Sequence, residues 1–344
     1  MIEKSNKTMK KAFHSIFAMI LAGMAATSCT DEVQFGNSFL DKAPGGSSNL
    51  VSIFSNPDYV NQFLTNIYNQ QYYGLPYSSA SGMTQAASPY NGKLDALTDL
   101  YQMHWSSPKV WKSYYSGTFS SKEDPLISFS NDNVWKTVHQ VSIIKENIDR
   151  VPNMSQEKKD YIVAQAKALQ AFAYSLLLPH YGGLPIIERT ISDNSEIGPR
   201  ATFEETVNAI VRWCDEAKDH LYWAYNGNDS ESNALQTGRW TKAGVMALKA
   251  QVLWLAASPL YNGAPYFGGS TEAEQQNLVG YGSFDQSRWE RAKKAFEEFW
   301  AENDRNGGYY HLMQPEKQDA NGYRLAYRRG YILSLIHISE PTRH

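Results

Sequence analysis

The chain has 344 residues with 32 basic and 35 acidic side chains, a formal net charge of −3, and only 19% charged residues. It has no basic excess with which to bind a nucleic-acid backbone, and it is not a charge-rich disordered segment. Two cysteines exclude a disulfide-dense scaffold. Tyr, Phe and Trp nevertheless make up 13% of a chain whose mean hydropathy is −0.49. So many rings require a large core or a surface that binds flat or ringed ligands.

The N-terminal segment has the order of features expected of a lipoprotein signal peptide. Four lysines between residues 4 and 11 precede an apolar run at 16–26, and small residues then lead to Cys29. The run is too short to cross a bilayer as a helix. This order predicts a signal peptide over residues 1–28, acylation of Cys29 by a fatty acid such as palmitate, and a lipidated tether over 29–50. The alternatives are a plain secretory signal and a short core helix.

Helical signals dominate the chain after residue 50. Asn56 and Pro57 suit the cap and first position of a helix. Valines and isoleucines spaced by three and four predict a second helix over 134–151. Ser155 is expected to open a third helix and Pro179 to stop it.

The same signals continue downstream. Thr202 and Glu205 form a capping box ahead of an apolar stripe at 207–221. Thr241 is expected to cap a helix that ends before Pro259. Because alternating strand patterns are few, the chain is predicted to be mainly α.

A last helix is expected to follow a second capping box, Ser287 with Glu290. Cys214 lies on the apolar side of its helix, which predicts a buried, unreactive thiol. The tryptophans on helices are expected to be core or helix-packing residues: Trp213, Trp254, Trp289 and Trp300.

Two segments of the chain repeat one pattern. Residues 179–185 and 259–265 both read Pro-x-Tyr-x-Gly-x-Pro, and each follows a helix rich in alanine. Alanines let helices approach closely, proline ends a helix, and glycine turns the chain. The alanine helices also resemble the second helix of a tetratricopeptide unit. We therefore expect a tetratricopeptide-like α-solenoid with long aromatic-rich loops.

No motif points to catalysis or to a cofactor. The sequence has no phosphate-binding loop, no H-E-x-x-H, no G-x-S-x-G and no C-x-x-C, and its eight histidines are scattered. Carboxylate pairs at a glycosidase separation cannot be recognised from sequence alone. We therefore expect no catalytic residue, no metal site and no cofactor, and a protein that is not an enzyme.

Aromatic residues gather in two loop regions, 72–119 and 261–284, among Gly, Ser, Pro and Asn. Sugar rings have apolar faces that stack on Trp and Tyr, and their hydroxyls need polar neighbours. The alternative is that these rings pack the loops onto the helices. The predicted ligand-binding residues are Asp99, Tyr101, Trp105, Trp111, Tyr114, Tyr115, Tyr266 and Tyr281.

An ordered series of segments resembles the SusD/RagB family of outer-membrane nutrient-binding lipoproteins. The series begins at Cys29 and covers nearly all of residues 29–310. One departure is Gln170, where the family usually carries an arginine, which puts a structural ion pair in doubt. The matching segments include 39–41, 166–174, 181–186, 199–205, 258–263 and 289–292.

The resemblance implies a surface-exposed, lipid-anchored protein with four tetratricopeptide-like units. Such a protein lies over a SusC-like TonB-dependent transporter, captures oligosaccharide, and performs no chemistry itself. On this interpretation residues 51–333 are a truncated SusD-like domain, and residues 334–344 are a foreign tail. Some of the loop aromatics would then face the transporter. The alternative function is peptide capture or protein interaction on the same helical fold.

Overall fold

The computed structural model describes residues 50–71, 98–99, 102, 114–118, 120, 134–192, 197–225 and 236–339, with side chains as far as residue 330. The chain divides into two compact units, residues 1–53 and 54–344. Of the first unit only α3 (Leu50–Ile53) is described. The predicted signal peptide, Cys29 and nearly all of the tether lie outside the described residues.

The second unit is built from helices, and no strand occurs within the ranges given above. The prediction of a mainly α fold is confirmed. None of the described helices is long and apolar enough to cross a membrane. The longer helices are α4 (Pro57–Asn69), α5 (Val134–Asn147), α6 (Gln156–Tyr181), α7 (Phe203–Lys218), α9 (Lys242–Ala257), α11 (Gln286–Arg305) and α12 (Ala320–Ser339).

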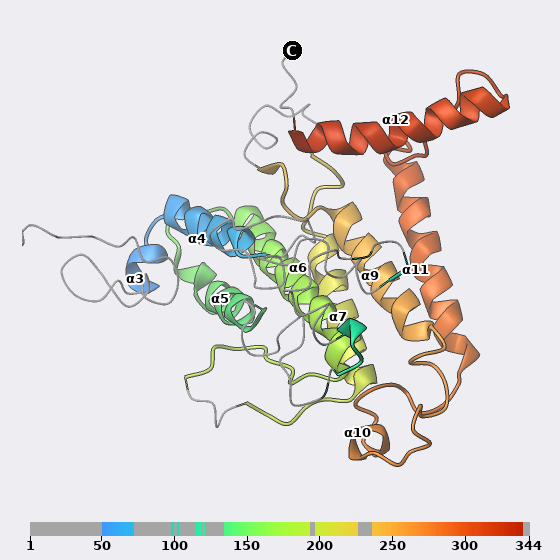
Figure 1. Cartoon of the computed structure of the whole chain (residues 1–344). Coiled ribbons are helices and arrows are strands. Elements are labelled where there is room, and N and C mark those ends of the chain that lie inside the picture. The colour runs from blue at the N-terminus through green and yellow to red at the C-terminus, as the bar shows by residue number, and fades with distance from the viewer. Residues whose placement is uncertain are drawn as a thin grey trace, which may run out of the picture. The chain divides into compact units, whose positions relative to one another are not determined.

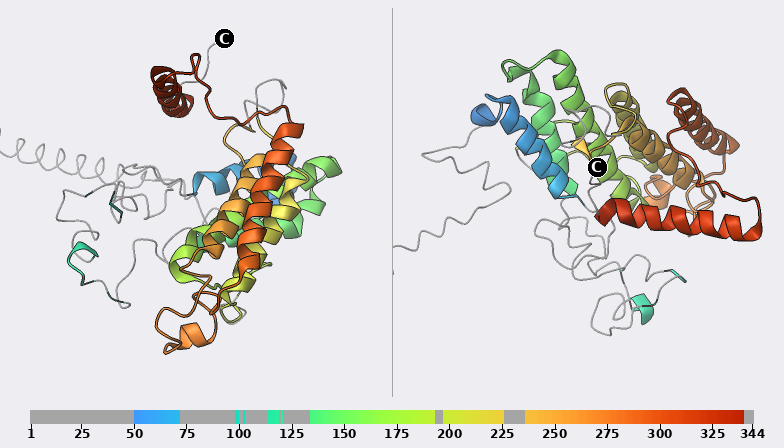
Figure 2. Two further views of the ribbon diagram at one scale, coloured as in Figure 1. Left: turned by 90° about the vertical axis from the view of Figure 1, so that its right-hand side faces the viewer. Right: turned by 90° about the horizontal axis from the view of Figure 1, so that it is seen from above.

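The helices α5, α6, α7, α9 and α11 lie side by side in this order (Figures 1 and 2). α5 packs on α6, α6 on α7, α7 on α9, and α9 on α11. A short 3-10 turn, Ile148–Arg150, follows α5, and the four-residue α10 (Glu272–Gln275) lies in the loop between α9 and α11. Each helix of this row packs mainly on its neighbours in sequence, which is the arrangement of an α-solenoid.

Small residues allow the close packing of the central helices. Ala168 and Ala171 of α6 and Ala250 of α9 are fully buried. Trp213 of α7 is 1% exposed, and its ring meets that of Tyr174 at a centroid distance of 4.8 Å. The alanine helices recognised in the sequence therefore form the core, with large aromatic rings filling the space between them.

Most of the predicted helix starts are confirmed. The side chains of Asn56, Ser155 and Thr241 accept hydrogen bonds from the first turns of α4, α6 and α9. Thr202 and Glu205 form the complete capping box of α7. These caps satisfy backbone N–H groups that lack partners inside the helix.

Two predicted boundaries are wrong. α6 continues through Pro179 to Tyr181. Proline is tolerated there because it removes only one backbone N–H, and the helix ends two residues later, before Gly182 with φ +71°. α11 begins at Gln286 and is capped by Asp285, whose side chain accepts from the Ser287 amide at 2.8 Å. The proposed Ser287 cap is therefore not formed.

Two of the four helix tryptophans are also not core residues. Trp213 is buried and Trp289 is partly buried against the core, as predicted. Trp254 and Trp300 are 57% and 49% exposed, so their prediction as packed residues is wrong. Their spacing identified helices but not which face each ring occupies.

The departure at Gln170 is accommodated by a lysine from the neighbouring helix. Lys145 of α5 donates to the Gln170 side-chain oxygen at 2.8 Å, and the Gln170 amide donates to the Ile187 carbonyl at 2.8 Å. Lys145 also lies 3.8 Å from Glu188. Burial lowers the pKa of Lys145, and the nearby Glu188 carboxylate partly opposes that effect. A cation therefore reaches this site from α5 rather than from α6.

Candidate functional site

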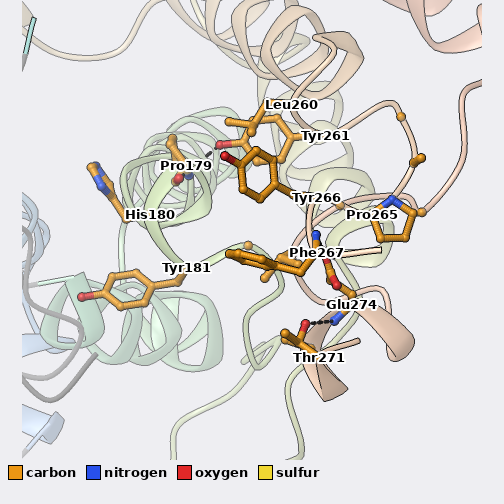
Figure 3. A pocket seen from close by; sticks show the side chains of 17 residues that line it. Pro179, His180, Tyr181, Leu260, Tyr261, Pro265, Tyr266, Phe267, Thr271 and Glu274 are labelled. Atoms are coloured by element: carbon orange, nitrogen blue, oxygen red, sulfur yellow. Dashed lines mark hydrogen bonds between the residues drawn. The ribbon is translucent and has the colours of Figure 1, made fainter. Parts of the chain in front are cut away.

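A pocket of about 460 Å³ lies where the end of α6 meets the loop between α9 and α11. Pro179, His180 and Tyr181 form one side, and Tyr266 and Phe267 form the other (Figure 3). Both copies of the Pro-x-Tyr-x-Gly-x-Pro pattern contribute to the lining. The repeated pattern therefore builds one shared site.

Two glycines at the end of α6 let three segments approach closely. A Cβ on Gly182 would lie 2.1 Å from the Leu278 carbonyl oxygen, and one on Gly183 would lie 1.9 Å from the Ala201 carbonyl oxygen. The Gly183 amide donates to the Leu278 carbonyl at 2.6 Å. Arg200 donates to the carbonyls of Tyr181, the last residue of α6, and of Gly183, just beyond the helix end. This side of the pocket is thus fixed by backbone contacts that only glycine permits.

Tyr261 joins the two copies of the repeated pattern. Its hydroxyl donates to the Pro179 carbonyl at 3.1 Å (Figure 3). Its ring stacks on Phe203 with a centroid distance of 4.7 Å and an interplanar angle of 11°. Burial raises the pKa of Tyr261, so the hydroxyl remains a donor. This residue fixes the α9 loop against the end of α6.

Tyr266 and Phe267 present an exposed pair of rings beside the pocket. They are 83% and 64% exposed, with centroids 5.0 Å apart and planes at 86°. Glu274 accepts hydrogen bonds from the Phe267 amide at 2.6 Å and from the Gly269 amide at 3.1 Å. Burial alone would raise the pKa of Glu274, but these bonds and those from Thr271 outweigh it and lower the pKa. The carboxylate is therefore charged at neutral pH.

Tyr281, the other residue predicted in this loop, is packed behind the pocket. Its ring meets Phe203 edge to face at 5.2 Å, and the Arg288 guanidinium lies 3.7 Å from the ring centroid. Burial raises its pKa to about 12. Because Arg288 covers one face of the Tyr281 ring, Tyr281 packs against its neighbours. The ring of Tyr266 is the one accessible to a ligand.

Those of the other predicted residues that the structure describes do not line this pocket. Asp99 and Tyr115 are exposed and Tyr114 is half-buried, and none of the three is among the described lining residues. Their role in ligand binding stays a prediction. Tyr101, Trp105, Trp111 and Cys29 lie outside the described residues.

The sequence did not single out Phe267, His180 or Glu274 as site residues. Phe267 adjoins Tyr266, and His180 lies inside the first copy of the repeated pattern. The repeated pattern is the available signal, but from the sequence alone it indicates only helix-ending geometry. The functional meaning of Glu274 depends on backbone contacts, which a sequence pattern does not display.

The pocket offers rings for stacking and groups for hydrogen bonding. Apolar rings lie beside a few polar groups, including His180, Tyr181 and Thr271. Among the described residues, no group of three or more His, Cys, Asp and Glu side chains is placed to hold a metal ion. Cys214 is 1% exposed, as predicted, and burial raises its pKa to about 12. At neutral pH this thiol is therefore protonated and is not a nucleophile.

Comparison with solved structures gives the fold. The chain is similar to BT4246, with a TM-score of 0.55 and 24% identity, covering 76% of this chain and 42% of that chain. It is also similar to a SusD superfamily protein from Bacteroides thetaiotaomicron VPI-5482, with a TM-score of 0.49, 14% identity, and coverage of 76% and 50%. The chain thus spans less than half of the length of BT4246. No protein with curated annotation matches the sequence.

Comparison with protein families gives the membership. Residues 38–252 match the model of a SusD-like family described as starch-binding and associating with the outer membrane. That match covers more than half of the chain and includes α4 to α7 and most of α9. The tetratricopeptide-like helical fold predicted from the sequence agrees with it. The chain belongs to the SusD-like family.

Proposed function

We propose that this protein captures oligosaccharide at the outer membrane and delivers it to a SusC-like TonB-dependent transporter. The proposal joins the description of the family, starch-binding and associated with the outer membrane, to the ring-lined pocket. The protein binds and releases its ligand without chemical change.

The observation that carries the proposal is the exposed ring pair of Tyr266 and Phe267. Apolar side chains as exposed as these are stabilised little by the fold, so their position suits contact with a ligand. A sugar ring can stack its C–H face on one ring and rest its edge against the other. Its hydroxyls can then reach His180, Tyr181 and Thr271 around the pocket.

The remaining parts of the proposal rest on the sequence and on the family. Acylation of Cys29 would hold the protein at the outer membrane, facing the cell surface. The predicted ligand contacts of the 72–119 region, above all Trp105 and Trp111, would extend the ring-binding surface for a longer chain of sugars. Intact-mass measurement of membrane-extracted protein should show the acyl chains on Cys29, and an unmodified secreted form would refute the anchor.

The binding proposal is tested by affinity electrophoresis in gels that contain starch, laminarin, xylan or no polysaccharide. We expect at least one polysaccharide to retard the wild-type chain. Tyr266→Ala and Phe267→Ala should reduce that retardation, while Phe284→Ala should not. Phe284 is a matched control because it is 63% exposed and follows in the same loop but does not line the pocket.

Two results would count against the proposal. Retardation by no polysaccharide, together with binding of mixed peptides, would support the alternative of peptide capture. Delivery is tested separately by purifying the tagged protein from detergent-solubilised outer membranes of its native cells and identifying by mass spectrometry any SusC-like transporter that co-purifies. Absence of a stable complex in detergent extracts would refute the transporter part and leave the glycan part standing.

A further inference from the structure

We propose that Glu274 is a positioning residue for ligand binding, whose carboxylate holds the Tyr266–Phe267 ring pair in the orientation that receives a sugar ring. This inference rests on the proposed function, because it concerns the same pocket. It assigns to Glu274 no contact with the ligand.

The contacts of Glu274 place it at the base of the ring-bearing loop. One carboxylate oxygen accepts from the Phe267 amide at 2.6 Å and the other accepts from the Gly269 amide at 3.1 Å. The side chain therefore spans the turn at Gly268 and joins its two sides. With 6% of its surface exposed, Glu274 is buried beneath the loop that it holds.

The loop has hydrogen bonds of its own, from the Gly268 amide to the Pro265 carbonyl at 3.1 Å and from the Ser270 hydroxyl to the Phe267 carbonyl at 2.7 Å, and Gln275 donates to the Gly269 carbonyl at 3.0 Å. Side-chain packing adds little to them. Gly268 and Gly269 both have positive φ, at +67° and +75°, and no atom lies within 4 Å of a Cβ built on either. Glycines in open space lose much conformational freedom when a loop is ordered. The two bonds to Glu274 add a restraint on both sides of Gly268, at the amides of Phe267 and Gly269.

The rings themselves contrast with Tyr261 in the same loop. Tyr261 is 7% exposed and is held by its stack on Phe203 and its bond to Pro179. Tyr266 and Phe267 lack that degree of burial, so the orientation of their rings follows the backbone that carries them. A ring pair that is already ordered binds its ligand without the entropic cost of ordering it.

Glu274 is itself attached to the rigid side of the pocket. Its amide donates to the Thr271 hydroxyl at 3.3 Å, and three residues after α10 the Leu278 carbonyl accepts from Gly183 at 2.6 Å. The carboxylate thus connects the ring-bearing loop to the end of α6. Within the described part of the chain Glu274 has no ion-pair partner, and its charge is met by backbone N–H groups and by a hydrogen bond from the Thr271 side chain.

The test compares Glu274→Gln with the matched control Glu272→Gln. Both residues lie on α10 and both changes remove one negative charge, but Glu272 bonds to the Gln276 side chain and not to the loop. In Glu274→Gln one of the two loop amides must face the new NH₂ group and loses its acceptor. Hydrogen exchange of the Phe267 and Gly269 amides reports the loop, and calorimetric titration with maltoheptaose reports binding.

We expect at least one of the two amides to exchange about tenfold faster in Glu274→Gln, while amides of α6, α9 and α11 keep their protection. If the ordered loop is then populated about a tenth of the time, the affinity for maltoheptaose falls about tenfold. Glu272→Gln should match the wild type in both measurements.

Three outcomes overturn the inference, and they can be told apart. Unchanged affinity in Glu274→Gln, with wild-type binding intact, refutes the positioning role and leaves the proposed function standing. Unchanged amide exchange with weakened binding shows that Glu274 acts on the ligand directly. Absence of wild-type binding to maltoheptaose and to the other polysaccharides refutes the proposed function and this inference together.

Discussion

Replacement of Gly183 by alanine tests the backbone geometry that forms one side of the pocket. The new Cβ would lie 1.9 Å from the Ala201 carbonyl oxygen, whereas ordinary contact begins at 3.4 Å. The two segments would therefore have to separate by roughly 1.5 Å, the difference between these distances. That movement strains the bond from the Gly183 amide to the Leu278 carbonyl, now 2.6 Å long.

The expected loss of stability combines two effects. Overpacking of a well-fitted site costs about 1–3 kcal/mol, and a broken backbone hydrogen bond adds about 1 kcal/mol. We therefore expect Gly183→Ala to lower the free energy of unfolding by about 2–4 kcal/mol. Urea unfolding followed by circular dichroism measures this difference.

Gly198→Ala is the matched control. No atom lies within 4 Å of a Cβ built on Gly198, so we expect a change within about 0.5 kcal/mol. If Gly183→Ala proves as stable as Gly198→Ala, the three segments at the end of α6 do not approach each other as closely as described. The pocket would then have a different shape from the one described.

Three further predictions concern the helical core. Glu188→Ala removes the carboxylate that accepts from the Trp213 indole N–H at 3.2 Å. Because Glu188 is part-exposed, the free energy of unfolding measured in urea should fall by only about 1 kcal/mol. An unchanged free energy of unfolding would contradict that role. The pKa of Glu302 is held below its ordinary 4.5, first by the hydrogen bond from Lys242, so its stabilisation is present above that value and is lost as the pH falls through the lowered pKa. Acid unfolding of Glu302→Gln should therefore show a smaller loss of stability in that range, and an identical profile would refute the linkage. The Cys214 thiol, with its pKa raised to about 12 by burial, should resist thiol reagents at neutral pH until urea unfolds the chain, and rapid labelling of the folded protein would show that it is accessible.

The helices were predictable where their ends depend on neighbouring residues. The Thr202–Glu205 capping box and the Ser155 cap involve residues three apart, and such pairs are visible in any sequence. The start of α11 was harder to predict, because both Asp285 and Ser287 suit a helix cap in the sequence. Asp285 is the one used, and its amide donates to the Asn262 side chain at 2.9 Å, 23 positions away. Contacts of that range are decided by packing.

The site was predictable only in its parts. The aromatic pattern of the sequence indicates Tyr266 as a candidate ligand contact. The sequence also shows that residues 179–185 and 259–265 repeat one pattern. It did not show that the packing of the helices brings both copies to one pocket, where Tyr261 bonds to Pro179. Composition likewise predicted many rings in the core, but not that Trp254 is exposed.

The central claim is that the ring pair beside this pocket binds a chain of sugars. Its most direct test is calorimetric titration with the polysaccharide fragment selected by the affinity gels, using wild type, Tyr266→Ala with Phe267→Ala, and the control Phe284→Ala. Removal of two stacking rings should cost about 1–3 kcal/mol, a loss of roughly tenfold to a hundredfold in affinity. The account predicts that loss in the double variant and wild-type affinity in Phe284→Ala. Equal affinity in all three proteins would contradict it.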